Sequence, residues 1–376
     1  MQHDRLASRT DADWMAGALA LARRGVGETW PNPTVGCVLV KDDVALARGR
    51  TARGGRPHAE AAAVDAARAS GIDVRGSTAY VTLEPCAHHG RTPPCAEALV
   101  AAGIQRAVIA TVDPDARVSG KGNAILRAAG IIVAQGVGRA EADEINAGFF
   151  CRVRTGRPLV TLKLATSLDG RIATVSGDSK WITGEAARAR GHLLRATHDA
   201  IMVGIGTALA DDPALTCRLP GLEGRSPIRI VVDSDARLPA ASDLARSART
   251  VPVWLMCADD APAAPVAALE ALGIVVQRLP RGPDRRIDPA ALFQALGGTG
   301  LTRVLVEGGG ALAAALLSAE LVDRLSVFHA GVVIGGDGVP GIAAMGLEKL
   351  ALARRFDRLS LAEAGDDVLE TWTRRA

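Results

Sequence analysis

The chain has 376 residues, 48% of them apolar, and a formal net charge of +3. That length and apolar content suffice for two hydrophobic cores, so we expect two domains. The nearly balanced charge and an aromatic content of 3% argue against nucleic-acid binding, which needs a basic surface and stacking side chains. The first residues, MQHDRLAS, contain no apolar signal core and no apolar run is long enough to cross a membrane, so we expect a cytoplasmic protein.

The first predicted elements are a helix over residues 14–24, where apolar residues recur at helical spacing, and a β-hairpin. The hairpin has a buried strand over 37–40 and a return strand over 44–47, with two aspartates between them. Asn32 stands between two prolines before this hairpin, which holds it in an extended loop. Its amide would contact a base or sugar edge, although a simple turn asparagine is the alternative.

Four side chains with metal and proton chemistry follow within one short segment: His58, Glu60, Cys86 and Cys95. One imidazole and two thiolates match a catalytic zinc ion, which takes three protein ligands and leaves a fourth position to water. Glu60 would then carry protons to and from that water. The alanine-rich run 59–68 after Pro57 predicts a helix whose first turn contains His58 and Glu60.

The two cysteines are predicted to lie at the ends of regular elements. A strand over 78–83 leads to Cys86, and two prolines place Cys95 at the N-terminus of a helix over 96–102. We expect the helix dipole to lower the pKa of the Cys95 thiol. A structural zinc site closed by His88 or His89 is the alternative, although such a site would not need Glu60.

The other cysteines have no ligand spacing, and in a cytoplasmic chain we expect them to fill the cores rather than form disulfides: Cys37, Cys151, Cys217 and Cys257.

The rest of the first half alternates strands with helices, which predicts a layered α/β domain with a largely parallel sheet. The strands are expected over 107–112 and 131–134, and the helices over 124–129 and 141–150. The stretch 155–158 reads as a linker, because neither pattern continues through it. We therefore expect one domain over residues 1–154 and another over 155–376.

The second half repeats this alternation. Strands are expected over 159–165, 200–203, 228–233, 253–256, 274–276, 304–306 and 325–328, and helices over 185–195, 266–272, 289–296 and 311–317. Glycine-rich loops at 204–207 and 307–310 follow two of the strands. Each loop alone is a weak signal, because tight turns need glycine anyway, but together they suggest a dinucleotide site of non-Rossmann pattern.

The segment VTLEPCAHHGRTPPC, with His-Ala-Glu upstream of it, resembles the deaminase of riboflavin biosynthesis. Zinc base deaminases share H-x-E followed by P-C-x-x-C, and here eight residues separate the two cysteines. Further along, LKLATSLDGRIA, SKWITG, LADDPALTCR and VEGGGAL resemble the reductase domain of the bifunctional riboflavin biosynthesis enzyme. The resemblance covers nearly the whole chain in the same domain order.

The resemblance implies an N-terminal cytidine-deaminase-like α/β/α layered domain and a C-terminal dihydrofolate-reductase-like α/β domain. The first would use Zn²⁺ to deaminate 2,5-diamino-6-(5-phosphoribosylamino)pyrimidin-4-one, and the second would use NADPH to reduce the ribosyl chain to ribityl. Residues implied to hold NADPH are Ala165, Trp181, Thr207, Ser234, Gly309, Gly310, Ala311 and Leu312. Residues implied to hold the substrate in the reductase are Ser179, Arg195, Asp211, Leu215, Arg218 and Glu307.

The chemistry of these side chains agrees with most of the implied roles. Arg195 and Arg218 offer forked donors suited to a phosphate, whereas carboxylates such as Glu307 accept from ribose hydroxyls. Lys163 is a further candidate near the reacting carbon, with simple packing as the alternative. In the deaminase, His88 and Arg91 are candidates for holding the substrate.

We expect a homo-oligomer that binds a small pyrimidine ribosyl phosphate, with neither nucleic acid nor membrane as partner. Two other functions remain open at this point. One is a nucleoside or nucleic-acid deaminase with an accessory domain, which the same zinc ligands would serve. The other is a non-catalytic binding protein with a structural zinc ion, against which the presence of Glu60 argues.

Overall fold

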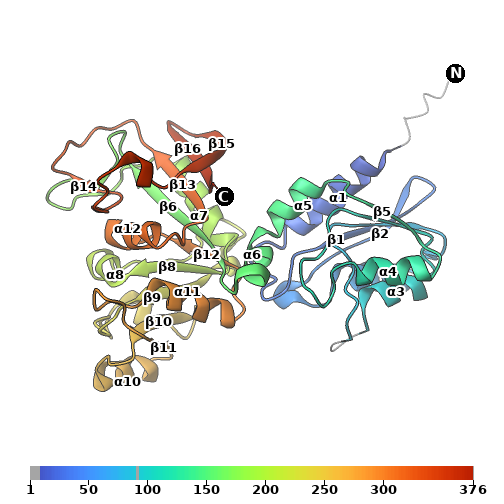
Figure 1. Ribbon diagram of the computed structural model, residues 1–376, viewed down its shortest axis with the longest axis horizontal. Helices are drawn as coiled ribbons and strands as arrows, with labels where there is room; N and C mark the ends of the chain where they lie inside the picture. Colours follow the sequence, from blue (N-terminus) through green and yellow to red (C-terminus); the bar gives the residue numbers. More distant parts are fainter. Residues whose placement is uncertain (1–8, 90–92, 376) are drawn as a thin grey trace. The chain divides into compact units, whose positions relative to one another are not determined.

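The computed structural model describes residues 9–89 and 93–375. The chain divides into two compact units, of which the first ends at Thr155 and the second begins at Gly156 (Figure 1). Each unit has its own sheet and its own helices. Among the described helices, none combines the length and the apolar character that a membrane crossing requires.

The first unit is built on a mixed five-stranded sheet. Its strands are β1 (Gly36–Lys41), β2 (Val44–Arg50), β3 (Thr78–Val81), β4 (Arg106–Ile109) and β5 (Ile132–Gln135). They lie in the order β2-β1-β3-β4-β5. Because β1 runs antiparallel to both of its neighbours and only β3, β4 and β5 are parallel, the expectation of a largely parallel sheet is wrong for this half.

The predicted hairpin is confirmed, and its turn explains the reversal. Asp42 and Asp43 both have positive φ, 50° and 59°. Two consecutive residues in this region form the tight turn whose twist matches that of paired strands, and aspartate tolerates this conformation better than most side chains.

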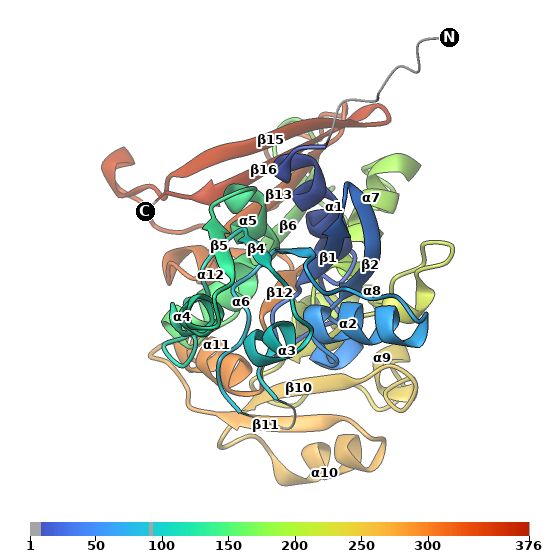
Figure 2. The same ribbon diagram turned by 90° about the vertical axis from the view of Figure 1, so that its right-hand side faces the viewer.

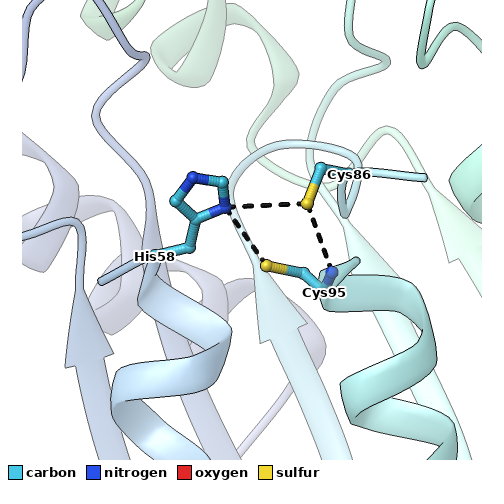
Figure 3. A group of neighbouring side chains, drawn as sticks. All are labelled: His58, Cys86 and Cys95. Atoms are coloured by element: carbon cyan, nitrogen blue, oxygen red, sulfur yellow. Dashed lines mark hydrogen bonds between the residues drawn. The ribbon is translucent and has the colours of Figure 1, made fainter. Parts of the chain in front are cut away.

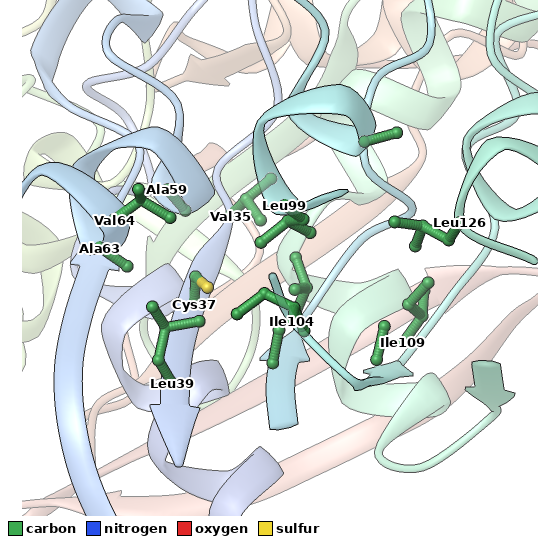
Figure 4. Close-up of a cluster of buried hydrophobic side chains, with 14 of the residues drawn as sticks. Val35, Cys37, Leu39, Ala59, Ala63, Val64, Leu99, Ile104, Ile109 and Leu126 are labelled. Carbon is green, nitrogen blue, oxygen red and sulfur yellow. The ribbon is translucent and has the colours of Figure 1, made fainter. Parts of the chain in front are cut away.

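Helices cover both faces of this sheet. They are α1 (Asp11–Arg23), α2 (Ala59–Ala69), α3 (Cys95–Ala101), α4 (Lys121–Ala128), α5 (Arg139–Ile145) and α6 (Ala147–Thr155), with a short 3₁₀ turn η1 (Arg53–Gly55). In Figure 1, α1 and α5 lie on one side of the strands and α3 and α4 on the other. Buried side chains of α2, α3 and α4, such as Ala63, Leu99 and Leu126, belong to one hydrophobic cluster with Cys37 and Leu39 of β1 (Figure 4). Each buried leucine contributes roughly 2 kcal/mol by removal of apolar surface from water.

Two details of the first unit depart from the sequence-based expectation. The helix expected over 141–150 is divided at Asn146, because the buried Asn146 side chain bonds the backbone of Thr34, accepting from its N–H at 2.9 Å and donating to its carbonyl at 3.1 Å. This pair of bonds fixes the loop that contains Asn32. Cys151 is half-exposed on α6, so the prediction that it fills the core is wrong, whereas the other three isolated cysteines are buried.

The second unit contains a nine-stranded sheet in the order β11-β10-β9-β8-β12-β6-β13-β16-β15 and a two-stranded sheet of β14 and β7. The strands are β6 (Leu159–Thr166), β7 (Arg171–Ala173), β8 (Ala200–Gly204), β9 (Ile228–Val232), β10 (Val253–Ala258), β11 (Val275–Leu279), β12 (Arg303–Val306), β13 (Arg324–His329), β14 (Val339–Pro340), β15 (Phe356–Ala364) and β16 (Asp367–Arg374). From β11 to β13 every pairing is parallel, and β16 and β15 add an antiparallel edge (Figure 2).

The helices of the second unit connect these parallel strands. They are α7 (Glu185–Ala196), α8 (Ile205–Asp211), α9 (Asp243–Arg246), α10 (Ala263–Ala271), α11 (Pro289–Gly298) and α12 (Gly310–Ser318), with 3₁₀ turns η2 (Glu223–Arg225) and η3 (Leu350–Leu352). The residues expected as a glycine-rich loop at 204–207 instead form the start of α8, with Gly204 as its N-cap. The C-terminal hairpin of β15 and β16 was not predicted, because β15 is exposed along nearly all of its length and has no buried face.

Candidate active sites

Three metal-binding side chains of the first unit converge on one point. The ligand atoms of His58, Cys86 and Cys95 all lie within 4.8 Å of one another. His58 Nδ1 is 3.3 Å from Cys95 Sγ and 3.6 Å from Cys86 Sγ, and it points toward both sulfurs (Figure 3). Nitrogen and sulfur ligands of a tetrahedral zinc ion are about 3.6 Å apart, given the usual metal–ligand bond lengths. The three side chains therefore fit zinc, and in the described part of the chain no fourth ligand, neither His88 nor His89, joins them.

Helix starts position two of these ligands. Cys95 is the first residue of α3, as predicted, and Pro94 is its N-cap. His58 is the N-cap of α2 rather than part of its first turn, and Pro57 precedes the helix. The expectation that the helix includes His58 is therefore off by one residue, whereas Glu60 does lie in the first turn.

Cys86 lies in the segment after β3, and a buried carboxylate fixes that segment. Glu84 accepts hydrogen bonds from the backbone N–H groups of Gly120 at 2.9 Å and Asn123 at 3.1 Å, at the start of α4. Gly122 allows this approach, since a Cβ there would be 2.0 Å from the Pro85 carbonyl oxygen. Glu84 is thus a positioning residue that holds Cys86 by joining its segment to a helix N-terminus.

The pKa values of the two thiols are shifted in opposite directions. The pKa of Cys86 is lowered to about 4, chiefly because its sulfur accepts from the Cys95 thiol and also from His58 and from the Cys95 backbone N–H at 3.2 Å. The pKa of Cys95 is raised, because its thiol donates to Cys86 and is buried beside Glu60. The expectation of a lowered Cys95 pKa is therefore wrong for these side chains alone: the N–H at the start of α3 stabilises the thiolate of Cys86 instead.

Glu60 lies beside the metal ligands on the wall of a cavity of about 320 Å³. Only 3% of its surface is exposed. Burial, followed by the negative charge of Cys86, raises the pKa of Glu60 to about 7. A carboxyl group with a pKa near neutrality can both accept and release a proton, whereas a bound cation would favour its charged form.

Other predicted deaminase residues also lie along this cavity. Asn32 lines it and donates from its amide nitrogen to the Gly55 carbonyl at 3.3 Å. His88 lines it too, with a buried Nδ1 that has no hydrogen-bond partner among the described residues. Arg91 lies outside the described residues.

The sequence-based prediction missed several charged residues of this cavity: Arg56, Asp113, Asp115, Arg117 and Arg152. Asp113 is 6% exposed, and burial raises its pKa to about 6. Its position directly after a strand was visible in the sequence, but its burial was not.

In the second unit, a cavity of about 310 Å³ lies at the carboxyl ends of the central parallel strands. Lys163 and Ala165 of β6 line it, as does Glu307, the residue that directly follows β12. Open parallel sheets bind ligands at this edge, because loops and helix starts converge there.

Glu307 forms the centre of a buried ion cluster in this cavity. The Arg195 guanidinium forks onto it, with Nε 2.9 Å from Oε1 and Nη2 3.0 Å from Oε2. Lys163 Nζ lies 3.6 Å from Oε2. Burial alone would raise the pKa of Glu307, but the charges of Lys163 and Arg195 outweigh burial and bring the pKa to about 2.

Because of this ion cluster, Arg218 is more available than Arg195 to bind a phosphate. Nη1 of Arg195 bonds the Thr216 carbonyl at 3.0 Å, so each of the three guanidinium nitrogens donates one hydrogen bond within the protein. Arg218 is exposed at the same cavity, and its side chain has no carboxylate partner among the described residues.

An exposed tryptophan forms part of the wall of the same cavity. Trp181 is 68% exposed, and the Arg188 guanidinium lies 4.8 Å from its ring centroid. Arg188 also donates to the Thr183 carbonyl at 2.7 Å. Arg188 therefore holds a flat, solvent-facing ring over the cavity, in a position suited to stacking on a ligand.

Two family models match the chain. Residues 8–111 match the cytidine and deoxycytidylate deaminase zinc-binding region, and residues 158–369 match the RibD C-terminal domain. The riboflavin biosynthesis protein RibD of Escherichia coli (strain K12) is 42% identical over 371 residues, covering 95% of this chain and 98% of the relative. That of Bacillus amyloliquefaciens is 39% identical over 356 residues, covering 94% of each. The chain belongs to the RibD family.

Solved structures of RibD proteins agree. RibD from Acinetobacter baumannii aligns with a TM-score of 0.85 at 39% identity, covering 97% of this chain and 99% of that one. A diaminohydroxyphosphoribosylaminopyrimidine deaminase/5-amino-6-(5-phosphoribosylamino)uracil reductase from Thermotoga maritima aligns with a TM-score of 0.84 at 33% identity, with the same coverage. The chain is therefore a bifunctional enzyme, a deaminase and a reductase, with the two predicted fold types in the predicted order.

Most residues that the resemblance assigns to the RibD reductase line one of two cavities. Those along the cavity of Glu307 are Ala165, Ser179, Trp181, Arg195, Thr207, Asp211, Arg218, Glu307 and Gly309. Those along a second cavity, of about 350 Å³, are Ser234, Ala311 and Leu312. Leu215 and Gly310 line neither cavity: Leu215 is buried in the core, and Gly310 packs so closely that a Cβ there would lie 2.7 Å from the Pro340 carbonyl oxygen.

The glycines at the start of α12 thus have packing reasons of their own. A Cβ on Gly308 would lie 2.8 Å from Leu312 Cδ2 and 3.2 Å from the Gly204 nitrogen. The Gly309 N–H donates to Thr207 Oγ1 at 2.9 Å. These contacts join the start of α8 to the start of α12 and form a common wall between the two cavities.

Proposed function

We propose that this chain catalyses two successive steps of riboflavin biosynthesis, hydrolytic deamination of a diaminopyrimidine ribosyl phosphate followed by reduction of its ribosyl chain. The observation that carries the proposal is the convergence of three zinc-type ligands beside the buried Glu60, in a chain whose second unit has a separate cavity at the carboxyl edge of a parallel sheet. Zn²⁺ and NADPH are the proposed cofactors.

In the deaminase, His58, Cys86 and Cys95 would hold zinc and leave its fourth position open to the cavity. Zinc, when bound, supplies a water molecule of lowered pKa. Glu60 would take a proton from this water, pass it to the ring nitrogen of the pyrimidine, and deliver a second proton to the departing ammonia. Asn32 and His88 would orient the pyrimidine, because both of these polar side chains line the same cavity.

In the reductase, NADPH when bound supplies a hydride for the anomeric carbon of the sugar. The carboxylate of Glu307 stays ionised and would accept from sugar hydroxyls, while Lys163 presents a positive charge where the ring oxygen becomes an alcohol. Arg218 would bind the substrate phosphate, since it is exposed at the cavity, whereas every guanidinium nitrogen of Arg195 already donates to Glu307 or Thr216. Trp181 would exclude water from the reacting carbon by stacking on the cofactor.

Replacing Glu60 by glutamine tests the deaminase half. The amide keeps the shape and cannot carry a proton, so we expect zinc content and fold to be unchanged and deamination to fall by roughly a hundred- to ten-thousandfold. Asp65→Asn, on the exposed face of the same helix, is the matched control and should deaminate normally. Deamination by the Glu60 variant within a few-fold of wild type would rule out Glu60 as the proton carrier.

The same variant tests whether the two activities divide at the junction near residues 155–158. Glu60→Gln should still oxidise NADPH when the deaminated ribosyl compound is supplied, and Asp211→Asn, at the reductase cavity, should still release ammonia. A folded Glu60 variant that cannot reduce even the deaminated compound would mean that the two sites are coupled or shared.

We also propose a homo-oligomer that assembles in the cytoplasm, a reducing compartment in which thiolate ligands persist. The support for assembly is β15, the outermost strand of the large sheet, on which Leu359 and Leu361 are 47% and 58% exposed. An exposed apolar edge strand pairs readily with a second copy. Sedimentation of Leu361→Arg should show a smaller species than wild type, and an unchanged oligomer would exclude this strand as the interface.

A further inference from the structure

A histidine of the reductase cavity contacts the loop that contains Arg218. His192 lies on α7, three residues before Arg195, and both side chains line the cavity of Glu307. The ring nitrogen Nδ1 of His192 accepts a hydrogen bond from the backbone N–H of Arg218 at 3.3 Å. Because a backbone N–H can only donate, this Nδ1 carries a lone pair and not a proton. The contact therefore requires the neutral ring, with its proton on Nε2.

The surroundings of His192 favour this neutral form. Burial lowers the pKa of His192 below its ordinary value of 6.5, and the positive charges of Arg195 and Arg218 lower it further. The Thr216 carbonyl and the negative charge of Glu307 raise the pKa, but these effects are smaller. At pH 7 the imidazole is therefore uncharged, and its Nδ1 is available as an acceptor.

The loop 212–218 depends on such contacts, because it belongs to no helix or strand. Asp212 and Leu215 have φ values of 38° and 53°, a left-handed conformation that side chains other than glycine adopt only when the surroundings hold them there. Asp211, directly before the loop, and Arg218, at its end, both line the cavity. The backbone of the loop thus decides where these two side chains stand.

Helix α7 holds the last three residues of the loop in succession. Arg195 donates from Nη1 to the Thr216 carbonyl at 3.0 Å. The buried Cys217 thiol donates to the His192 carbonyl at 3.5 Å, and the N–H of the next residue, Arg218, donates to the His192 ring. His192 therefore binds the loop through both its backbone and its side chain.

Other elements hold the rest of the loop without His192. The buried Arg229 of β9 donates from Nη1 to the Ala214 carbonyl at 3.2 Å. The Cys217 N–H donates to Ser226 Oγ at 3.1 Å. Loss of the imidazole should therefore release the N–H of Arg218 and leave the preceding residues of the loop in place.

We propose that His192 is a positioning residue for the substrate phosphate: its neutral imidazole fixes the backbone N–H of Arg218 and thereby directs the Arg218 guanidinium into the cavity. The inference rests on the proposed reductase function, in which Arg218 binds that phosphate. The Arg218 side chain is exposed and has no carboxylate partner among the described residues, so its backbone anchor limits the directions it can take. An anchored donor loses less conformational freedom when it pairs with phosphate.

Two amide variants separate the roles of the two ring nitrogens. The amide oxygen of asparagine lies as many bonds from Cα as Nδ1 does, whereas the amide of glutamine reaches the position of Nε2. We expect His192→Gln to raise the reductase KM for the deaminated ribosyl compound roughly tenfold, near the lower end of what a charged hydrogen bond contributes, and to change kcat less than threefold. His192→Asn should keep KM within threefold of wild type. Arg190→Gln, on the exposed face of the same helix and outside the cavity, is the matched control and should leave KM unchanged.

A double variant shows whether His192 acts through Arg218. Arg218→Gln alone should raise KM more than His192→Gln does. Adding His192→Gln to it should raise KM by less than a further twofold, because the side chain that the imidazole directs is already absent. Multiplicative effects of the two substitutions, or an asparagine variant as impaired as the glutamine variant, would contradict positioning through Nδ1.

Calorimetry with ribose 5-phosphate supplies a readout that does not depend on turnover. Wild type and His192→Asn should bind this compound alike, and at least fivefold more tightly than His192→Gln. If this ranking is found but the deaminated ribosyl compound is not reduced, the inference stands and the proposed reductase function fails. If that compound is reduced while all three proteins bind ribose 5-phosphate alike, the reductase function stands and His192 does not position the phosphate ligand.

Discussion

Replacing Glu307 by glutamine removes the negative charge at the centre of the reductase cavity while keeping the shape of the side chain. Two cations face this carboxylate, Arg195 through two hydrogen bonds and Lys163 at 3.6 Å. The pKa of Glu307 is about 2, against an ordinary value of 4.5. A shift of that size corresponds to roughly 3 kcal/mol in favour of the folded, ionised form.

The direction of the pKa shift determines the pH range in which Glu307 stabilises the folded state. Because the folded pKa is lowered, the contribution of Glu307 is complete above pH 4.5, the ordinary value, and is lost as the pH falls toward 2. At pH 7 we therefore expect Glu307→Gln to destabilise the second unit by about 3 kcal/mol, since it also leaves Arg195 and Lys163 buried without their counter-ion. The difference from wild type should shrink below about pH 4.5.

The measurement must distinguish the two units, because a two-domain chain need not unfold in one step. Hydrogen exchange followed by mass spectrometry does so: peptides from β12 should exchange about a hundredfold faster in the variant, and peptides from β3 should be unaffected. Glu270→Gln, on the exposed surface of α10, is the control and should match wild type. A loss below about 1 kcal/mol at pH 7 would refute the reasoning that Arg195 and Lys163 stabilise this carboxylate.

Two further predictions concern the deaminase unit. Cys86→Ser and Cys95→Ser should each lose zinc in metal analysis of the purified protein, because each removes one of three ligands; full zinc content in both variants would contradict the assignment. Asp113→Asn should stabilise the first unit by up to about 3 kcal/mol at pH 7, because burial raises the Asp113 pKa to about 6 and thus penalises its charged form above that pH. Urea unfolding at pH 7 and pH 5 measures this gain, which should be smaller at pH 5; equal stability of variant and wild type at pH 7 would show that the buried charge costs nothing.

The metal ligands could be predicted from sequence because their chemistry is rare and their separations are short. His58 and Cys95 lie at two helix starts and Cys86 lies in the segment after β3, and local signals mark the boundaries of these elements to within a residue or two. The sequence did not predict which of the two thiols has the lowered pKa. That depends on a hydrogen bond from the backbone N–H of Cys95, at the start of α3, to Cys86 Sγ, and this contact forms only in the folded structure.

The reductase cavity was harder to predict because long-range contacts decide its electrostatics. The sequence suggested Arg195 as a phosphate ligand, yet Glu307, 112 residues away, takes its forked donors.

Asp113 was missed because burial, rather than residue type, gives it a raised pKa. The hairpin of β15 and β16 was missed because β15 is exposed along nearly all of its length, so no buried face marks it as a strand.

The most direct test of the central claim is to follow ammonia release and NADPH oxidation in one reaction of the purified, zinc-loaded protein with the diaminopyrimidine ribosyl phosphate. Without NADPH, we expect one ammonia per substrate and an accumulating ribosyl product. With NADPH, oxidation should begin only after ammonia has appeared and should reach the same total. NADPH oxidation that precedes ammonia release, or the absence of ammonia from zinc-loaded protein, would contradict the account.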